Sequence, residues 1–398
     1  MAMIPESRAE RSRREASYFG AIADRGVDAF LRNGSGLSLR VHLIDGTLVP
    51  IVVSDGRNHK PSFVSPHAHY VGYPIHELGR GPGWWTPTVL RATLAPLSAL
   101  FRVAKLDQVV YVNHWLLSAG PAVRVGQAPL RSFIAQLAGA YPEHVLVFPG
   151  VVPALAPALA RTLADLGGRA VRSGVVHLLD PSDPMRGGAM KGVRRNRRLD
   201  RMLRHQNQTR RTTDPAVLLQ HVDRLQQLYS ALYLHKHPGH LNPQYTTDFF
   251  ELLLRSGLFV VAGWLRDGKV EAFNVQLVVD RVICWSVCGL DVSAPQTRGL
   301  FRLLADDDVA LAERDGLIVN WGRGNEAFKR LRGARPALEY DLVFDRHVGP
   351  ARRLPWALLQ RLRAWPGVLR STLHTGSTDS PWSLPTTTAT NLGADRPT

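Results

Sequence analysis

Polar side chains that could bind a ligand stand where a buried strand is expected to end. The apolar run 317–321 predicts this strand, and Asn320 and Arg323 lie at its end and just beyond it. In α/β folds, groups that contact ligands gather at such strand ends. An arginine there can bind a carboxylate or a phosphate through two parallel hydrogen bonds. We therefore predict that Asn320 and Arg323 contact a substrate.

A second group of reactive side chains lies in the segment 233–242. Three of its residues are histidines, and Tyr233 and Asn242 flank them. A metal site is not expected, because the loop offers no second ligand pair at a defined spacing. We predict that His237 accepts a proton and that Tyr233 and Asn242 shape an acceptor pocket. A plain surface or helix-capping loop is the alternative interpretation.

Polar residues also interrupt a predicted antiparallel meander in the second half of the chain. Its three strands are expected over residues 258–265, 270–279 and 282–290. Asn274 and Gln276 are two residues apart and therefore share one face of their strand. Because polar groups on an inner sheet face need partners, we predict that these two residues, with Trp285 on the next strand, border a substrate groove. An exposed sheet face is the alternative.

The most basic part of the chain, residues 191–211, is a candidate nucleic-acid surface. The chain has 49 Lys and Arg against 33 Asp and Glu, which gives a formal net charge of +16. A field of this size attracts polyanions. The candidate contacts are Arg194, Arg195, Arg197, Arg198, Arg201 and Arg204. The alternatives are a GC-rich genome that inflates the arginine content and a solvated connecting helix.

The length of 398 residues fits two domains of ordinary size. We predict an N-terminal helix or frayed segment at 1–30, a first domain at 31–180, a basic linker or helix at 181–213, a second domain at 214–370 and a disordered tail at 371–398. No apolar run is long enough to span a membrane, and the N-terminus does not have the pattern of a signal peptide. We therefore predict a cytoplasmic protein.

Several further residues are expected to be structural. Cys284 and Cys288 form neither a disulfide framework nor a zinc pattern, and we expect them to be buried thiols. The three aspartates 306–308 are expected on a solvated helix face. Glu339 is expected to pair with an arginine from the segment 329–335.

The run 320–333 carries a motif in which a strand and a glycine-containing loop precede Phe328-Lys329-x-x-x-Gly333. This motif, together with the segments 232–245 and 63–66, resembles the Fem-type and BioF2-like acyltransferases of the GNAT superfamily. The resemblance implies an α/β fold with two tandem GNAT-like domains, each a mixed, mostly antiparallel sheet flanked by helices, the second being catalytic. It also implies that Lys329 holds the negative charge that develops on the transferred acyl group. Arg332 could share or replace this role.

The acyl donor is a separate question. GNAT enzymes bind the pyrophosphate of coenzyme A at a glycine-rich turn that opens a helix. Here Gln296 and Gly299 fit that pattern, but Phe301 replaces the small residue that lets the backbone approach a phosphate. This difference argues against a conventional coenzyme A donor, although the turn could also simply begin a helix.

Fem-type relatives use aminoacyl-tRNA, whose phosphates need a broad basic surface. Our first hypothesis is therefore an acyltransferase without a tightly bound cofactor that moves an aminoacyl group from tRNA to a small amine or hydroxyl acceptor. The second hypothesis is an N-acetyltransferase that uses acyl-CoA. The third is a catalytically inactive protein that binds tRNA or another RNA.

Overall fold

The computed structural model describes residues 7–56, 61–78, 87–183, 190–234, 241–295 and 298–364. Its α-helices are α1 (Arg8–Arg25), α2 (Tyr73–Leu78), α3 (Pro87–Val103), α4 (Gln127–Ala140), α5 (Pro157–Asp165), α6 (Met190–Gln206), α7 (Pro215–Leu219), α8 (Val222–Tyr233), α9 (Thr247–Arg255), α10 (Leu300–Asp315), α11 (Glu326–Arg330) and α12 (Pro350–Ala364). Its strands are β1 (Leu37–Ile44), β2 (Thr47–Ser54), β3 (Val109–Val112), β4 (Val145–Val151), β5 (Arg169–Leu179), β6 (Arg210–Thr212), β7 (Val260–Arg266), β8 (Lys269–Val279), β9 (Val282–Leu290), β10 (Ile318–Asn320) and β11 (Arg335–Phe344). None of these helices is long and apolar enough to cross a membrane.

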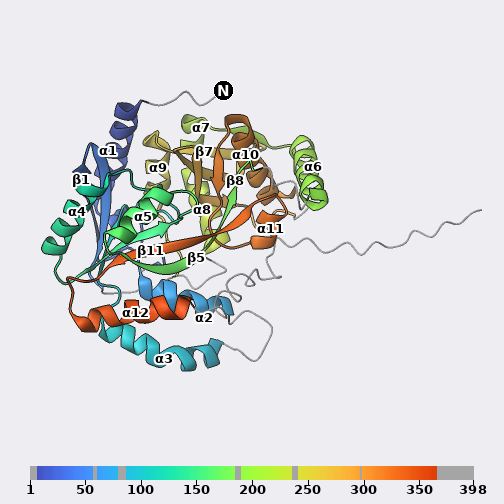
Figure 1. Ribbon diagram of the computed structural model, residues 1–398. Helices are drawn as coiled ribbons and strands as arrows, with labels where there is room; N and C mark the ends of the chain where they lie inside the picture. The colour runs from blue at the N-terminus through green and yellow to red at the C-terminus, as the bar shows by residue number, and fades with distance from the viewer. Residues whose placement is uncertain are drawn as a thin grey trace, which may run out of the picture.

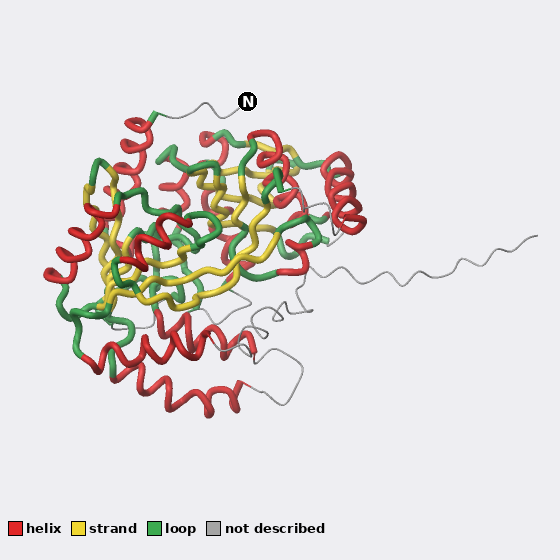
Figure 2. The backbone as a smooth tube through the Cα atoms, in the orientation of Figure 1, coloured by secondary structure: helices red, strands yellow, loops and turns green. Residues whose placement is uncertain are grey.

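The described strands form one sheet of eleven strands in the order β1-β2-β3-β4-β11-β5-β10-β9-β8-β7-β6. Neighbouring strands are antiparallel except in the pairs β3–β4 and β9–β10. Figure 1 shows α12, α2 and α3 below β5 and β11, and α6 at the outer edge beside α10 and α11. Figure 2 shows the strands running through the middle of the molecule, with helices around them. The predicted α/β class with a mostly antiparallel sheet is confirmed.

The two halves of the chain share this sheet. β11 comes from the second half but lies between β4 and β5 of the first half. On its other edge, β5 pairs with β10 of the second half. The loop 321–334, which connects β10 to β11, therefore has to cross over β5. This crossing brings the motif around Lys329 against a strand from the first half.

Short-range turn chemistry sets two of the hairpins. Asp45 and Gly46 have φ values of 49° and 69° and join β1 to β2. Left-handed conformations at both central residues match the twist of a two-residue hairpin. Asp280 and Arg281 make the same kind of turn between β8 and β9 without a glycine, with φ values of 50° and 62°.

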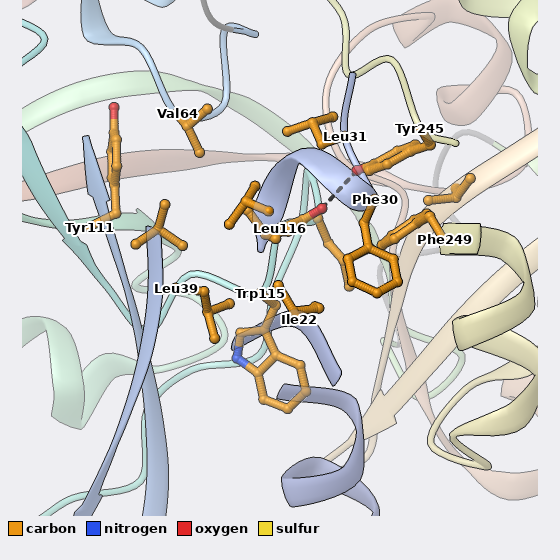
Figure 3. Packing of buried hydrophobic residues seen from close by; sticks show 14 of the residues in the cluster. Ile22, Phe30, Leu31, Leu39, Val64, Tyr111, Trp115, Leu116, Tyr245 and Phe249 are labelled. Carbon is orange, nitrogen blue, oxygen red and sulfur yellow. Dashed lines mark hydrogen bonds between the residues drawn. The ribbon is translucent and has the colours of Figure 1, made fainter. Parts of the chain in front are cut away.

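The largest hydrophobic cluster also joins the halves (Figure 3). Tyr245 of the second half stacks on Phe249 with ring centroids 4.0 Å apart. The hydroxyl of Tyr245 donates to the carbonyl of Leu116 in the first half at 2.8 Å. Tyr18 of α1 donates to the carbonyl of Trp115 at 2.9 Å. These contacts satisfy phenol groups inside an apolar core, which would otherwise cost free energy on burial.

Candidate active site

β9 and β10 separate and leave a wedge in the sheet. They pair at three positions only, the last of which joins Cys284 to Asn320. β9 continues to Leu290, whereas the chain turns away after β10. At this turn the side-chain oxygen of Asn320 accepts the N–H of Gly322 at 3.0 Å, and Gly322 has a φ of 63°. A point where strands part is a common ligand-binding position in α/β folds.

A cavity of about 1230 Å³ lies at this wedge. Tyr233, Trp285 and Lys329 line it from the second half, and His114 and His177 line it from the first. This volume is sufficient to enclose a small substrate. Both halves of the chain therefore build the candidate active site.

Lys329 faces this cavity from α11. Its side chain is buried, and Nζ donates to the carbonyls of Gly322 at 3.0 Å and Arg323 at 2.7 Å. An ammonium has three N–H donors, so one remains for a ligand oxygen. Burial lowers the pKa of Lys329 to about 7 because the protein interior disfavours the charged form.

Arg323 and Asn320 line the cavity. Nε of Arg323 donates to Glu339 at 2.7 Å, and the guanidinium also contacts the ring of His69. Glu339 thus pairs with Arg323, so the expected pairing with the segment 329–335 was wrong. The loop crossing explains this, because Arg323 lies across β5 at Gly174, where a Cβ atom would be 2.5 Å from Nε.

Tyr233, Asn242 and Trp285 also line the cavity. The amide of Asn242 donates to the carbonyl of Tyr233 at 2.9 Å, which fixes the two ends of the histidine loop together. His237 and the other two histidines of this loop lie outside the described residues. Nε1 of Trp285 is buried without a hydrogen-bond partner among the described residues.

Asn274 and Gln276 lie elsewhere. They are fully buried, do not line the cavity, and donate to the carboxylate of Asp308, the Asn274 bond being 3.1 Å long. Trp321 donates to the same carboxylate at 2.9 Å. Asn274 and Gln276 therefore neither border the cavity nor lie on an exposed sheet face. Their position indicates that they hold α10 against the sheet.

The solvated face that we expected for Asp306, Asp307 and Asp308 is also wrong, because all three are buried. Asp306 pairs with Arg204 at 2.7 Å, and Asp307 pairs with Arg211 at 2.7 Å. The charges of α10 are thus covered by arginines of α6 and β6, which come from a segment distant in sequence.

Arg332 lies outside the cavity in a buried ion pair. Its Nε lies 2.8 Å from Asp200 of α6, and its guanidinium stacks 3.5 Å from the ring centroid of Phe328. Arg302 of α10 binds the same carboxylate at 2.5 Å. Arg332 therefore ties α6 to the loop that carries Lys329. Its predicted catalytic role is replaced by a structural one.

We expect Asp200→Asn to lower the free energy of unfolding by about 3 to 5 kcal/mol, because it leaves two cations with an uncompensated charge in a buried site. Urea denaturation followed by circular dichroism measures this change. Glu251→Gln is the matched control, because Glu251 forms an exposed pair with Arg255 at 2.7 Å that contributes at most about 1 kcal/mol. Equal losses in the two variants would contradict a stabilising role for the Asp200 ion pairs.

The N-terminus of α10, where coenzyme A would bind in a GNAT enzyme, is covered by α6. Gly299 has a φ of 55°, and a Cβ atom there would clash with the side chain of Leu203. Asn207 donates to the carbonyl of Arg298 at 2.9 Å. Phe301 packs on Trp285 and on Phe328, with ring centroids 5.7 Å and 4.7 Å away. Gln296 lies outside the described residues.

The exposed side of α6 is basic. Of the six predicted arginines, Arg197 pairs with Glu313 and Arg204 with Asp306. The remaining four are exposed and form no salt bridge with a described residue: Arg194, Arg195, Arg198 and Arg201. These four side chains are exposed, whereas Asp200 of the same helix is buried and binds Arg332.

The two thiols are buried, as predicted. Sγ of Cys288 lies 3.1 Å from the hydroxyl of Tyr233 and lines the cavity. Burial raises the pKa of both Cys284 and Cys288 to about 12. Because the thiolate is the nucleophilic form, a covalent intermediate on either cysteine is disfavoured at neutral pH.

His177 lines the cavity although no sequence motif pointed to it. It lies on β5 and is 2% exposed. Its one signal in the sequence is a histidine inside the apolar run 175–179. Its backbone N–H donates to the carbonyl of Gly322, and its carbonyl accepts the N–H of Trp321, so it lies directly under the crossing loop.

Comparisons with known proteins agree with this architecture. Residues 189–330 match the family described as acetyltransferase (GNAT) domain. A search of curated proteins finds no match.

Three solved structures are similar to the chain. The C-terminal domain (DUF2156) of a protein assigned as a lysylphosphatidylglycerol synthetase from Agrobacterium fabrum is 16% identical, with 89% of this chain and 97% of that one covered and a TM-score of 0.47. FemX is 8% identical, with coverages of 83% and 92% and a TM-score of 0.46. L-PGS from Bacillus licheniformis is 12% identical, with coverages of 59% and 78% and a TM-score of 0.42. These likenesses are distant, and the assignment below rests on the sequence match.

The match covers the segment 189–330, which contains α6, the meander, α10 and Lys329. The resemblance that the motif indicated is thereby confirmed, and the protein is an acyltransferase of this fold.

Proposed function

We propose that the protein transfers an aminoacyl group from tRNA to the amine or hydroxyl of a small acceptor bound in the cavity. The observation that carries this proposal is the position of α6. This helix covers the coenzyme A position at the N-terminus of α10 and presents four unpaired arginines to solvent.

Lys329 supports the chemical step. Attack of an amine on the ester carbonyl of aminoacyl-tRNA forms a C–N bond and puts negative charge on the carbonyl oxygen. The third N–H of the Lys329 ammonium is free to donate to that oxygen, while the carbonyls of Gly322 and Arg323 hold the other two. A donor fixed in advance in a buried site stabilises such an oxyanion more than water does. The ester C–O bond then breaks and releases the tRNA hydroxyl.

The covered α10 terminus argues against the second candidate, an acyl-CoA donor. A pyrophosphate needs free backbone N–H groups and close approach. Here Leu203 lies on Gly299, and Phe301 fills the adjacent space between Trp285 and Phe328. Binding coenzyme A in the usual GNAT way would require α6 to move and break the Asp200 ion pairs.

Electrostatics supports the tRNA donor. Lys and Arg side chains that neutralise phosphates release counterions, which drives binding at moderate salt. The Arg332–Asp200 pair attaches α6, which carries the four exposed arginines, to the segment that follows Lys329. A polyanion bound to these arginines would therefore lie on the helix that contacts this segment.

The test is a transfer assay in which mixed aminoacyl-tRNA or acetyl-CoA is the donor and a pool of small amines is the acceptor. We expect transfer from aminoacyl-tRNA, salt-sensitive tRNA binding and no change of melting temperature with acetyl-CoA. Transfer from acetyl-CoA together with thermal stabilisation would replace the proposal with the second hypothesis. Tight tRNA binding without any transfer would support the inactive RNA-binding protein.

A further inference from the structure

His177 is a buried histidine with unused hydrogen-bonding capacity in the cavity. It is 2% exposed, and neither Nδ1 nor Nε2 has a hydrogen-bond partner among the described residues. The carbonyl of Gly322, which accepts the backbone N–H of His177, also acts on the ring and raises its pKa, but no hydrogen bond from a described residue to either ring nitrogen has normal geometry. Buried polar groups are rarely left unpaired, and one that lines a cavity is therefore available to a ligand.

His114 provides an internal comparison. It lines the same cavity and is 4% exposed. Both of its ring nitrogens are occupied, because Nε2 lies 3.0 Å from the carbonyl of Phe63 and Nδ1 accepts the N–H of Leu116 at 3.1 Å. The fold therefore provides hydrogen-bond partners for the ring nitrogens of His114 but not for those of His177.

We propose that His177 accepts the proton of the attacking nucleophile and returns it to the leaving oxygen. This role rests on the proposed acyl transfer. A neutral imidazole has one lone pair and one N–H, so it can take the proton of an amine as the C–N bond forms. As the ester C–O bond breaks, the same proton moves to the released hydroxyl oxygen, and His177 is neutral again.

The charges around His177 favour this sequence of events. Burial and, second, the cation of Lys329 lower the pKa of His177 to about 4, so the ring is neutral at pH 7. Lys329 and Arg330 of α11 are the charged groups that act on it. Its two backbone neighbours are uncharged: Trp321, which follows β10, and Pro336 of β11. The imidazolium next to Lys329 becomes favourable only when the carbonyl oxygen gains negative charge, which couples the two steps.

The experiment compares His177→Gln, His177→Ala and His347→Gln with the wild-type chain, with hydroxylamine as the acceptor and the hydroxamate as the measured product. His347 does not line the cavity, and its Nε2 lies 2.8 Å from the carbonyl of His144. The donor is whichever the wild type uses. If tRNA is inactive and acetyl-CoA is active, the donor proposal fails and the His177 test proceeds with acetyl-CoA.

We expect kcat to fall about 100-fold or more for both His177 variants, with unchanged circular dichroism. We also expect added imidazole to restore activity to His177→Ala in proportion to its neutral form. His347→Gln should keep kcat close to the wild-type value and show no response to imidazole. Wild-type kcat in His177→Gln would overturn the inference, as would a loss in His177→Ala that imidazole does not restore while the fold is intact.

Discussion

Replacing Lys329 with methionine lowers kcat for acyl transfer about 100- to 1000-fold, which is the typical effect of removing one oxyanion donor. Methionine keeps the length and the apolar stem of lysine but cannot donate. The variant should remain folded, because Lys329 is buried and its ammonium is itself disfavoured there. Single-turnover transfer measures the chemical step. A loss of less than about tenfold would contradict the role of Lys329 as the oxyanion donor.

The pH dependence of acyl transfer distinguishes an oxyanion donor at Lys329 from a base at the same position. With a pKa of about 7, Lys329 loses its proton as the pH rises through neutrality, so an oxyanion donor becomes less active above pH 7. Lys329→Arg should remove this alkaline decrease, because arginine stays protonated. An activity that rises through pH 7 in the wild type would instead identify Lys329 as a base.

The stability of the protein should change with pH through the same group. An unfolded lysine has a pKa of about 10.4, whereas the folded pKa is about 7. Between these values the unfolded state holds a proton that the folded state has lost, so stability rises with pH. The melting temperature of Lys329→Met should therefore rise less with pH than that of the wild type.

Replacing Arg194, Arg195, Arg198 and Arg201 with glutamine weakens tRNA binding and makes its salt dependence less steep. Each phosphate contact contributes roughly 0.7 to 0.9 to the slope of log K against log salt, so loss of four contacts reduces the slope by about three. The four side chains point to solvent and form no salt bridge with a described residue. The fold should therefore be unaffected. Titration of labelled tRNA at several salt concentrations measures the slope.

A matched variant removes the same number of charges elsewhere. Arg13, Arg131, Arg161 and Arg361 are also exposed and lie on α1, α4, α5 and α12. If net charge alone drove binding, both variants would lose the same affinity. We expect the control to keep most of the wild-type slope. We also expect kcat of the α6 variant at saturating tRNA to be close to wild type, because none of the four arginines lines the cavity.

The sequence predicted the parts of the site that depend on local chain direction. Asn320 and Arg323 line the cavity because a short buried strand ends there, and that ending is visible in the apolar pattern. Lys329 was placed by a motif of fixed spacing. Tyr233, Trp285 and Asn242 also line the cavity, while the position of His237 lies outside the described residues.

Three expectations failed because side chains from distant segments decide them. Asp306, Asp307 and Asp308 looked like a solvated face, yet arginines of α6 and β6, together with polar residues of β8, cover them. Arg332 looked catalytic, yet Asp200, 132 residues away, binds it. Glu339 found its partner in Arg323 because the loop crosses β5. The hydrophobic periodicity of one segment does not predict which distant segment packs against it.

The chain by itself therefore determined the strands, hairpins, motif and charge that define a GNAT acyltransferase. Only the tertiary structure decided that β11 inserts beside β5, that α6 covers the start of α10, and that His177 and Lys329 line the same cavity. The physical reason is that strand order and helix docking are set by which apolar and charged faces meet across the whole fold. Local sequence encodes those faces, but not their partners.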